Sequence, residues 1–419
     1  MQSQPSEHRV RIEQLRAHLR NQGYRSIARS DYLPIVRRFL TYLADHNREA
    51  ETASPADVEG FLRRELRVYR KRHGRAPPSI PNWRRHHAAP VQLILHLVQG
   101  RWPPEPAVNP ESLRETFHRE LLEGYDRWMD ELRGLAAVTR AQRIDRARAL
   151  LTGLGERSEP NLLRDLAVRD IDTYLAHRAD GLRRKSIATT FADLRVFLRY
   201  LHYSGITVRD LSTAVTSPTL YAYEGIPSAL PAEDVEKVIA TTRQDHTPAG
   251  RRDYAILTLL ATYGLRAGEI TALRLDDLDW KNDVLHVRHT KTGTSSTLPL
   301  TRGAGEALLS YLESGRPQCP IREVFLCVNA PYRAFPNGTA LYTVIERRLD
   351  AAGVVPPGKK GPHAFRHACA VRLLRAAVPL KEIGDILGHR STLSTGVYLK
   401  LATEDLRAVA LEVPAAVSP

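Results

Sequence analysis

The spacing of apolar residues predicts a chain that is helical over most of its first half. Stretches such as RRFLTYLADH at 37–46 and RVFLRYLHYSG at 195–205 repeat apolar side chains every three or four residues. That spacing places them along one face of a helix, and β-branched runs are few. We therefore predict small bundles of amphipathic helices for residues 1–225.

The last part of the chain mixes helical and strand-like patterns. RRDYAILTLLATYG at 251–264 has helical spacing and ends on a glycine. DVLHVRHTKTGTSSTLPL at 283–300 alternates apolar and polar residues, turns near Thr292 and Gly293, and alternates again, as a β-hairpin does. With further helices expected near 340–352 and 364–376, the fold class is α+β with a small antiparallel sheet.

Two proline-rich breaks, at 101–110 and 216–231, divide the chain, because proline removes an amide donor and stops helices. We expect three domains, covering residues 1–105, 111–215 and 226–419. ADVEGFL at 56–62 is similar to RDIDTYL at 169–175, and the sequences that follow are also similar in order. This indicates a diverged tandem repeat of one helical domain, although unrelated amphipathic helices could align equally well.

The charge balance favours a polyanionic partner. The formal net charge is +14, and most of it comes from arginine, whose forked donors suit phosphates. Residues 1–110 hold 19 basic and 10 acidic side chains, against 18 and 17 in 111–225 and 24 and 20 in 226–419. We expect nucleic-acid contacts from two basic clusters, which are Arg63, Arg64, Arg70, Lys71 and Arg72, and Arg183, Arg184 and Lys185.

Other partners and compartments are not favoured. No apolar run approaches the roughly 20 residues that span a bilayer, and the N-terminus lacks the apolar stretch of a signal peptide, so we expect a cytoplasmic protein with no membrane partner. The three cysteines have no metal-ligand spacing. His363 and His367 lack the glutamate of an H-E-x-x-H motif, so neither a metal site nor a cofactor is expected.

One segment, HAFRHACAVRLLRAAVPLKEIGDILGHRSTLSTGVYLK at 363–400, carries several ionisable groups within helical apolar spacing. His363 and Arg366 are three residues apart near a helix N-terminus, which favours an anion. Gly388 suits the left-handed end of a helix and would present His389 at a turn. Tyr398 follows a polar connection. Each residue alone would more often be core or a solvated face.

Five motifs in order resemble the tyrosine recombinase, or phage integrase, superfamily: TYGLRAGEI at 262–270, HTKTG at 289–293, HAFRH at 363–367, LGHRS at 387–391 and TGVYLK at 395–400. The resemblance implies that Tyr398 is the nucleophile and that Glu269 supports the site. It implies five further catalytic residues, which are Arg266, Lys291, His363, Arg366 and His389. Lys291 is the weakest of these transfers, since hairpin length varies, and Lys281 is a second candidate.

This sequence departs from the family pattern in small ways. Ala368 and Cys369 stand where the family often has a hydroxyl residue, and Ala377 stands where a glycine is common. The chemistry fits the residues present: two arginines can clamp a phosphodiester, and a tyrosine hydroxyl, with an ordinary pKa of about 10, needs a cationic pocket to attack it. Lys291 could protonate the leaving 5′-oxygen. The resemblance implies a covalent 3′-phosphotyrosine intermediate and no requirement for metal or ATP.

The resemblance also implies partners and organisation. We expect the protein to bind double-stranded DNA at a specific recombination site and to form a homotetramer in a synaptic complex. We also expect it to be associated with a bacterial nucleoid and to be encoded by a mobile genetic element. Residues 111–215 resemble the family's helical core-binding domain, with residues 1–105 as a second domain of the same kind. The tail after Tyr398 would dock on a neighbouring protomer or on its own chain. The need for accessory proteins stays open.

Two alternative functions remain at this stage. A type IB topoisomerase shares this kind of active site but relaxes supercoils. A non-catalytic architectural DNA-binding relative would keep the fold, although such a protein would have no need of Tyr398.

Overall fold

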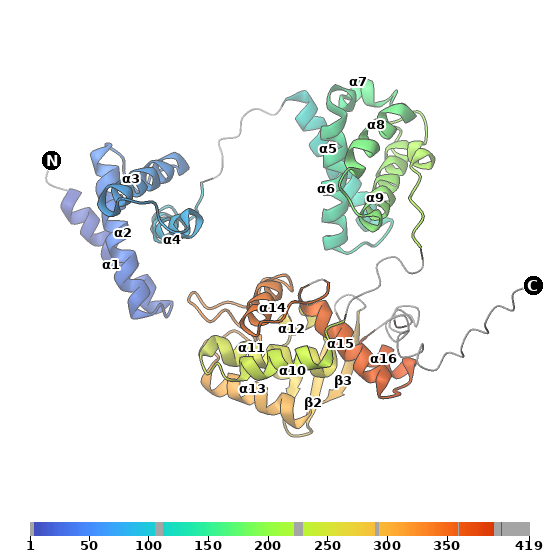
Figure 1. Ribbon diagram of the computed structural model, residues 1–419. Helices are drawn as coiled ribbons and strands as arrows, with labels where there is room; N and C mark the ends of the chain where they lie inside the picture. Colours follow the sequence, from blue (N-terminus) through green and yellow to red (C-terminus); the bar gives the residue numbers. More distant parts are fainter. Residues whose placement is uncertain are drawn as a thin grey trace, which may run out of the picture. The chain divides into compact units, whose positions relative to one another are not determined.

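The computed structural model describes residues 4–104, 112–221, 229–289, 293–358, 360–388 and 395. It is mainly helical, with one three-stranded antiparallel sheet (Figure 1), which confirms the fold class predicted from the sequence. The chain forms two compact units, Glu105–Glu224 and the combination of Met1–Pro104 with Gly225–Pro419. Among the described residues, three large apolar cores and one small one lie along the chain. The three-domain division itself stays a proposal.

Four helices make up the first part of the chain: α1 (Gln4–Asn21), α2 (Ser26–Asp45), α3 (Pro55–His73) and α4 (Ile80–Gln99). Ser54 begins α3 because its backbone N–H donates to Asp57 Oδ2 at 2.8 Å, which satisfies one amide that the helix leaves unpaired. Gly74 ends α3 in the left-handed conformation, with φ of 65°. The apolar faces meet around Leu15, Phe39 and Ile94, all fully buried.

The unit Glu105–Glu224 is also helical. It contains α5 (Leu113–Glu131), α6 (Ala137–Leu154), η1 (Gly155–Ser158), α7 (Pro160–Leu163), α8 (Val168–Ala179), α9 (Arg184–Tyr203) and η2 (Leu211–Ala214). Tyr125 of α5 packs against Phe197 of α9 with ring centroids 5.0 Å apart at the centre of the core. The stretches that suggested a repeat fall on α3 and α8 and on α4 and α9, in the same order. That order supports the repeat, which remains a prediction.

The C-terminal part combines seven helices among its described residues with the sheet. They are α10 (Ala232–Arg243), α11 (Pro248–Tyr263), α12 (Ala267–Thr271), α13 (Arg302–Ser314), α14 (Ala340–Ala351), α15 (Pro362–Arg375) and α16 (Leu380–Ile386), with the 3-10 turn η3 (Leu275–Asp277). The strands are β1 (Leu278–Asp279), β2 (Val284–His289) and β3 (Thr294–Pro299), in the order β1–β2–β3. Val284 pairs with Pro299 and His289 with Thr294, so the predicted hairpin is confirmed.

Helix α11 lies at the centre of this part, and Asp253 is fully buried on it. Its carboxylate accepts hydrogen bonds from Arg252, Arg347 and Arg348, the last at 2.8 Å. Arg348 also donates to Asp245. Partial burial opposes ionisation of Asp245, but the hydrogen bonds from Thr247 and Arg348 outweigh it and lower the pKa of Asp245 to about 2. This ionic network joins α11 to α14.

Ala377, which follows α15, adopts a left-handed conformation with φ of 57°. A side chain with a Cβ is strained there, whereas glycine is not, which gives a physical reason for the glycine that the family resemblance leads us to expect at this position. None of the helices that the structure describes is long and apolar enough to cross a membrane.

Candidate active site

The predicted site begins where α11 ends. Gly264 closes the helix in the left-handed conformation with φ of 62°, and Arg266 then stands at the residue before α12. The guanidinium of Arg266 donates from Nη1 to Glu269 Oε1 at 2.7 Å and from Nη2 to the carbonyl of Gly388 at 2.9 Å. These bonds use two of the five N–H groups that an arginine side chain offers, so the group keeps capacity for an anion.

Glu269 is buried beneath Arg266 and accepts bonds on both oxygens. Oε2 accepts from the backbone N–H of Arg266 at 2.7 Å, and Oε1 contacts His289 Nδ1 at 2.8 Å as well as the guanidinium. Burial opposes ionisation of this carboxyl, but the hydrogen bonds and the positive charge of Arg266 outweigh it and hold the pKa of Glu269 below its ordinary value. Glu269 is therefore an anion that fixes the backbone and side chain of Arg266 together.

Arg366 lies on α15 and is also buried. Its Nη1 donates to the carbonyl of Gly264 at 2.7 Å, and its Nη2 donates to the carbonyl of Leu387 at 2.6 Å. His363, one turn earlier, is exposed, and its ring centroid lies 6.2 Å from that of His367. The sequence predicted that His363 and Arg366 would project together from one face, yet Arg366 points into the protein and binds carbonyls, whereas His363 is at the surface.

Both arginines hold the end of α16. Leu387 and Gly388 are consecutive, and their carbonyls accept from Arg366 and Arg266 respectively. Gly388 has φ of 60°, and a Cβ there would come within 2.5 Å of the His289 ring, so only glycine fits. Buried Thr395 lies against Gly384 of the same helix. The structure therefore brings three sequence-predicted side chains, Arg266, Glu269 and Arg366, to the backbone segment Leu387–Gly388.

Three predicted catalytic residues, Lys291, His389 and Tyr398, lie outside the described residues, as does the tail after Tyr398. Lys281, the second lysine candidate, is exposed in the turn before β2.

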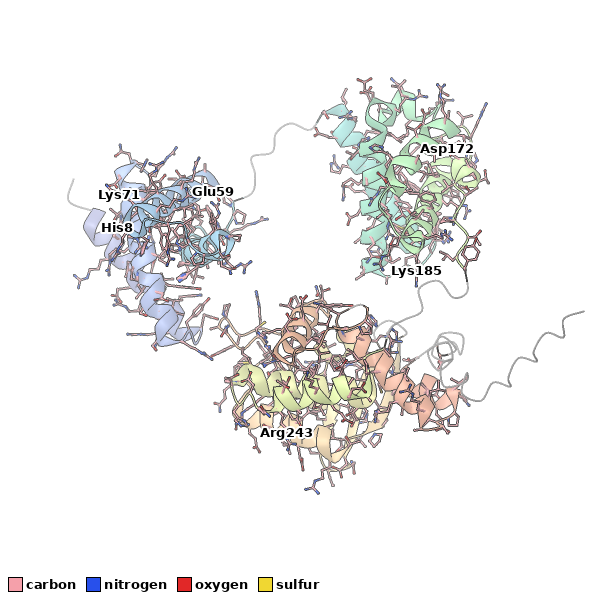
Figure 2. All side chains as sticks on the ribbon, viewed as in Figure 1. His8, Glu59, Lys71, Asp172, Lys185 and Arg243 are labelled. Carbon is pink, nitrogen blue, oxygen red and sulfur yellow. The ribbon has the colours of Figure 1, made fainter. Side chains whose placement is uncertain are left out.

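The basic residues that were predicted to contact nucleic acid are all exposed. Lys71 extends from the end of α3, and Lys185 lies at the start of α9 (Figure 2). Arg64 donates to the carboxylate of Asp45 at 3.0 Å. The Arg184 guanidinium lies 5.3 Å from the centroid of the Tyr221 ring. The remaining members are Arg63, Arg70, Arg72 and Arg183, all at the surface.

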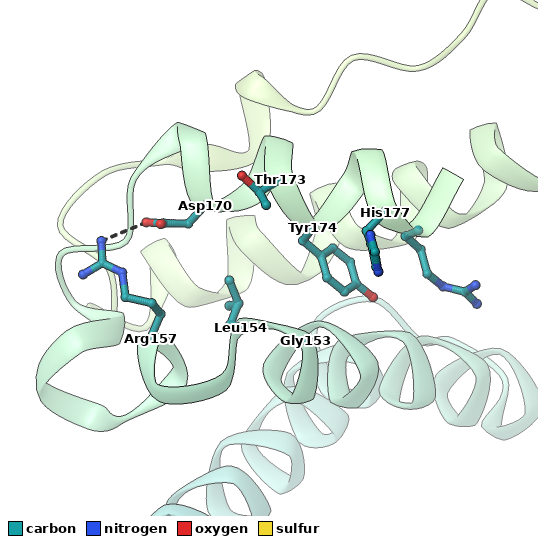
Figure 3. Close-up of a pocket in the computed structure, with 8 residues that line it drawn as sticks. Gly153, Leu154, Arg157, Asp170, Thr173, Tyr174 and His177 are labelled. Atoms are coloured by element: carbon teal, nitrogen blue, oxygen red, sulfur yellow. Dashed lines mark hydrogen bonds and ion pairs between the residues drawn. The ribbon is translucent and has the colours of Figure 1, made fainter. Parts of the chain in front are cut away.

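A pocket in the unit Glu105–Glu224 has fewer groups that could act in catalysis than the predicted site (Figure 3). Arg157 donates to Asp170 at 3.0 Å on one side, and Tyr174 packs against Gly153 on the other. Burial opposes ionisation of Asp170, but hydrogen bonds from the Ala167 N–H and from Arg157 hold its pKa below the ordinary value. The carboxylate therefore accepts a hydrogen bond from the backbone at the start of α8 and stabilises that helix end. The pocket is lined by none of the predicted site residues.

Sequence reasoning assigned no separate function to His289, although the structure places it beside Glu269. It lies at the inward end of β2, is almost fully buried, and contacts Glu269 and Ser296 through its two ring nitrogens at 2.8 Å and 2.7 Å. The alternation of the strand carried the signal, because it places His289 on the same face as buried Leu285 and Val287.

This chain is mainly helical, and its C-terminal part combines two neighbouring arginines with a small hairpin sheet. Proteins that are similar to it are known. A family model described as the phage integrase family matches residues 228–405. The integrase/recombinase y4gC of Sinorhizobium fredii is 56% identical over 189 residues, which cover 45% of this chain and 97% of that protein. A second from the same organism, y4rA, is 36% identical over 298 residues, 70% of each chain.

Solved structures share the fold. A lambda integrase dimer bound to a core site matches with a TM-score of 0.53 at 18% identity, over 71% of this chain and 99% of that one. The Tn1549 transposon integrase in complex with a circular intermediate DNA matches with a TM-score of 0.52 at 18% identity, over 69% and 99%. The family model and the curated relatives show an enzyme that cleaves and rejoins DNA strands. The chain belongs to the tyrosine recombinase superfamily, in the phage integrase family.

Proposed function

We propose that this recombinase exchanges DNA strands at a specific site through a covalent 3′-phosphotyrosine intermediate, using Tyr398 as nucleophile and no metal or ATP. The observation that carries the proposal is the convergence of Arg266 and Arg366 on the carbonyls of Gly388 and Leu387, next in the chain to His389. Two cations held at one place are what a phosphodiester transition state needs, since negative charge builds on its non-bridging oxygens.

The first step breaks one P–O bond and makes another. The Tyr398 hydroxyl loses its proton to a base, for which His363 is the candidate, and its oxygen bonds to phosphorus. The bond from phosphorus to the 5′-oxygen breaks, and that oxygen takes a proton from Lys291. Arg266, Arg366 and His389 neutralise the phosphate during the transfer.

The second step runs the same chemistry in reverse with a different strand. A 5′-hydroxyl of the partner duplex attacks the phosphotyrosine, the tyrosine oxygen leaves and regains its proton, and the DNA is sealed. The phosphotyrosine bond keeps the energy of the phosphodiester, so the proposal needs no ATP.

Recognition and assembly are part of the proposal. One lambda integrase structure is a tetramer bound to a Holliday junction, and we extend that arrangement to this chain. In the unit Glu105–Glu224, the exposed basic residues at the start of α9 would contact DNA. The exposed basic residues of α3 would add contacts to DNA outside the core site. The relatives named as integrases favour recombination over the supercoil relaxation of a topoisomerase.

Trapping on nicked substrates tests the proposal. Nicked duplexes from the DNA flanking the native gene would be offered to the wild type in the presence of EDTA, because a nick lets the cleaved end diffuse away and leaves the adduct. We expect a covalent protein–DNA adduct from the wild type and none from Tyr398→Phe. Tyr342 is an exposed tyrosine of α14, so Tyr342→Phe is the matched control and should form as much adduct as the wild type.

A DNA that the wild type binds but never cleaves would contradict the enzyme mechanism. An adduct that appears only when a divalent metal is added would contradict the absence of a metal requirement. Strand-exchange products rather than relaxed circles would separate recombination from topoisomerase activity.

A further inference from the structure

We propose that His289 is a positioning residue for the cleavage reaction, because it fixes both groups that hold the guanidinium of Arg266. The inference rests on the proposed function, in which Arg266 binds the scissile phosphate. His289 acts through two neighbours, Glu269 by a hydrogen bond and Gly388 by packing. It does not itself touch the phosphate.

The first contact sets the orientation of Glu269. An ionised carboxylate only accepts hydrogen bonds, so the 2.8 Å contact from His289 Nδ1 to Oε1 requires a proton on Nδ1. Oε1 also accepts from Arg266 Nη1 at 2.7 Å, which makes it a shared acceptor. The other bonds to this carboxylate come from Arg266 itself, through its backbone N–H to Oε2 and its guanidinium to Oε1, so His289 fixes Oε1 independently of the Arg266 side chain.

The imidazole is itself held from the other side. Its Nε2 lies 2.7 Å from the hydroxyl of Ser296 on β3, and the ring is 1% exposed. His289 and Ser296 lie on paired strands, so the sheet fixes the ring before any substrate binds. A continuous set of contacts therefore runs from β3 through His289 and Glu269 to Arg266.

The second contact supports the other acceptor of Arg266. The face of the His289 ring packs against Gly388 so closely that a Cβ at that glycine would meet ring atoms at 2.5–2.6 Å. The carbonyl of Gly388 accepts from Arg266 Nη2 at 2.9 Å. Both Glu269 and Gly388 thus depend on the same imidazole, and a change at residue 289 should move the guanidinium at both of its contacts.

Variants of residue 289 separate hydrogen bonding from packing. His289→Phe keeps a ring against Gly388 and removes both hydrogen bonds. His289→Asn can place an amide donor near the Nδ1 position, facing Glu269, whereas the longer His289→Gln places its amide near the Nε2 position, facing Ser296. The measurements are the single-turnover rate of adduct formation on a nicked duplex at saturating protein and, separately, the Kd for that duplex.

We expect His289→Phe to slow adduct formation by about 30-fold with Kd within about twofold of wild type, because a small displacement of a catalytic cation is costly in rate. His289→Asn should restore the rate to within about fivefold, whereas His289→Gln should stay at least about 10-fold slow. His286→Phe is the matched control, since His286 lies on the exposed face of the same strand. It should cleave like the wild type.

The outcomes are distinct. A wild type that forms no adduct contradicts the proposed function itself. A wild type that forms the adduct while His289→Phe cleaves equally fast overturns the positioning role. If His289→Phe lowers the thermal midpoint too far to assay, the comparison of Asn with Gln decides, and equal rates for those two variants overturn the inference.

Discussion

Arg266 and Arg366 are 100 positions apart in the chain, yet they donate to consecutive backbone carbonyls, those of Gly388 and Leu387. Each arginine has a further anchor, Glu269 for Arg266 and the carbonyl of Gly264 for Arg366. The end of α11, the start of α12 and the end of α16 are therefore joined at one point. The same two side chains attach the segment that leads to His389 and place two positive charges beside it.

Replacing Arg366 by lysine tests whether the forked shape matters as well as the charge. Lysine keeps the positive charge but cannot donate to the carbonyls of Gly264 and Leu387 at once. We expect Arg366→Lys to lower the rate of adduct formation by at least about 100-fold and the free energy of unfolding by about 2 kcal/mol. Cleavage kinetics and urea unfolding monitor the two effects.

Arg372→Lys is the matched control for that change. Arg372 lies on the same helix and donates through one nitrogen to the carbonyls of Ala261 and Thr262, but it is exposed. Its replacement should cost less than about 1 kcal/mol. Equal losses for the two variants would contradict a special role for Arg366.

The lowered pKa of Glu269 predicts that the stability of the protein depends on pH. The folded pKa of this carboxyl is lowered from 4.5, so its stabilising effect is complete above pH 4.5 and is lost as pH falls through the folded pKa. Glu269→Gln should lower the free energy of unfolding by about 2 kcal/mol at pH 7, and the difference from wild type should shrink at acid pH. Urea titrations at pH 7 and at successively lower pH measure it.

The exposed Glu306, paired with Arg302 on α13, supplies a control for the pH experiment. Glu306→Gln should change stability by less than about 1 kcal/mol at any pH. A constant difference between wild type and Glu269→Gln from neutral to acid pH would show that the Glu269 carboxylate does not contribute as an ion.

Two neighbouring alanines allow a test of backbone strain. Ala377 has φ of 57°, whereas Ala376 has φ of −78°. Ala377→Gly should raise the free energy of unfolding by about 0.5 kcal/mol because strain is relieved, and Ala376→Gly should lower it by about 0.5–1 kcal/mol because only chain entropy changes. Thermal and urea unfolding would show opposite signs. Destabilisation by both glycines would exclude strain at Ala377.

The basic end of α3 predicts salt-dependent DNA binding. Arg70, Lys71 and Arg72 are exposed in the last turn of that helix. Changing all three to glutamine should reduce the slope of log K against log salt by about 2 to 3, because each lost phosphate contact removes about one released counterion. Deletion of residues 1–100 should flatten the slope further. An unchanged slope in both proteins would place the N-terminal segment away from DNA.

The sequence predicted the elements of the fold well, for identifiable reasons. The alternation at 283–300 and the glycine after 251–263 are local signals, and β2, β3 and the end of α11 follow them closely. Arg266, Glu269 and Arg366 were predicted as site residues because short motifs carry them, and the structure places them close together. Their catalytic roles stay a prediction. Their anchoring on Leu387 and Gly388 could not be predicted, because contacts of side chains with distant carbonyls leave no pattern in the sequence.

His289 and Asp253 show where pattern reading fails. Each is a polar residue at an inward position of an apolar pattern, and each is buried with charged partners. An inward polar residue signals a bonded network, but some of its partners come from other elements. Asp253 contacts its neighbour Arg252 and also Arg347 and Arg348 of α14, about 95 residues away in the chain.

The most direct test of the central claim is to identify the residue that carries the DNA. The adduct formed on a nicked duplex would be digested with protease and nuclease, and the modified peptide would be sequenced by mass spectrometry. The account predicts a 3′-linked nucleotide on Tyr398 in the wild type and no modified peptide from Tyr398→Phe. A nucleotide on any other residue, or an adduct that persists in Tyr398→Phe, would contradict it.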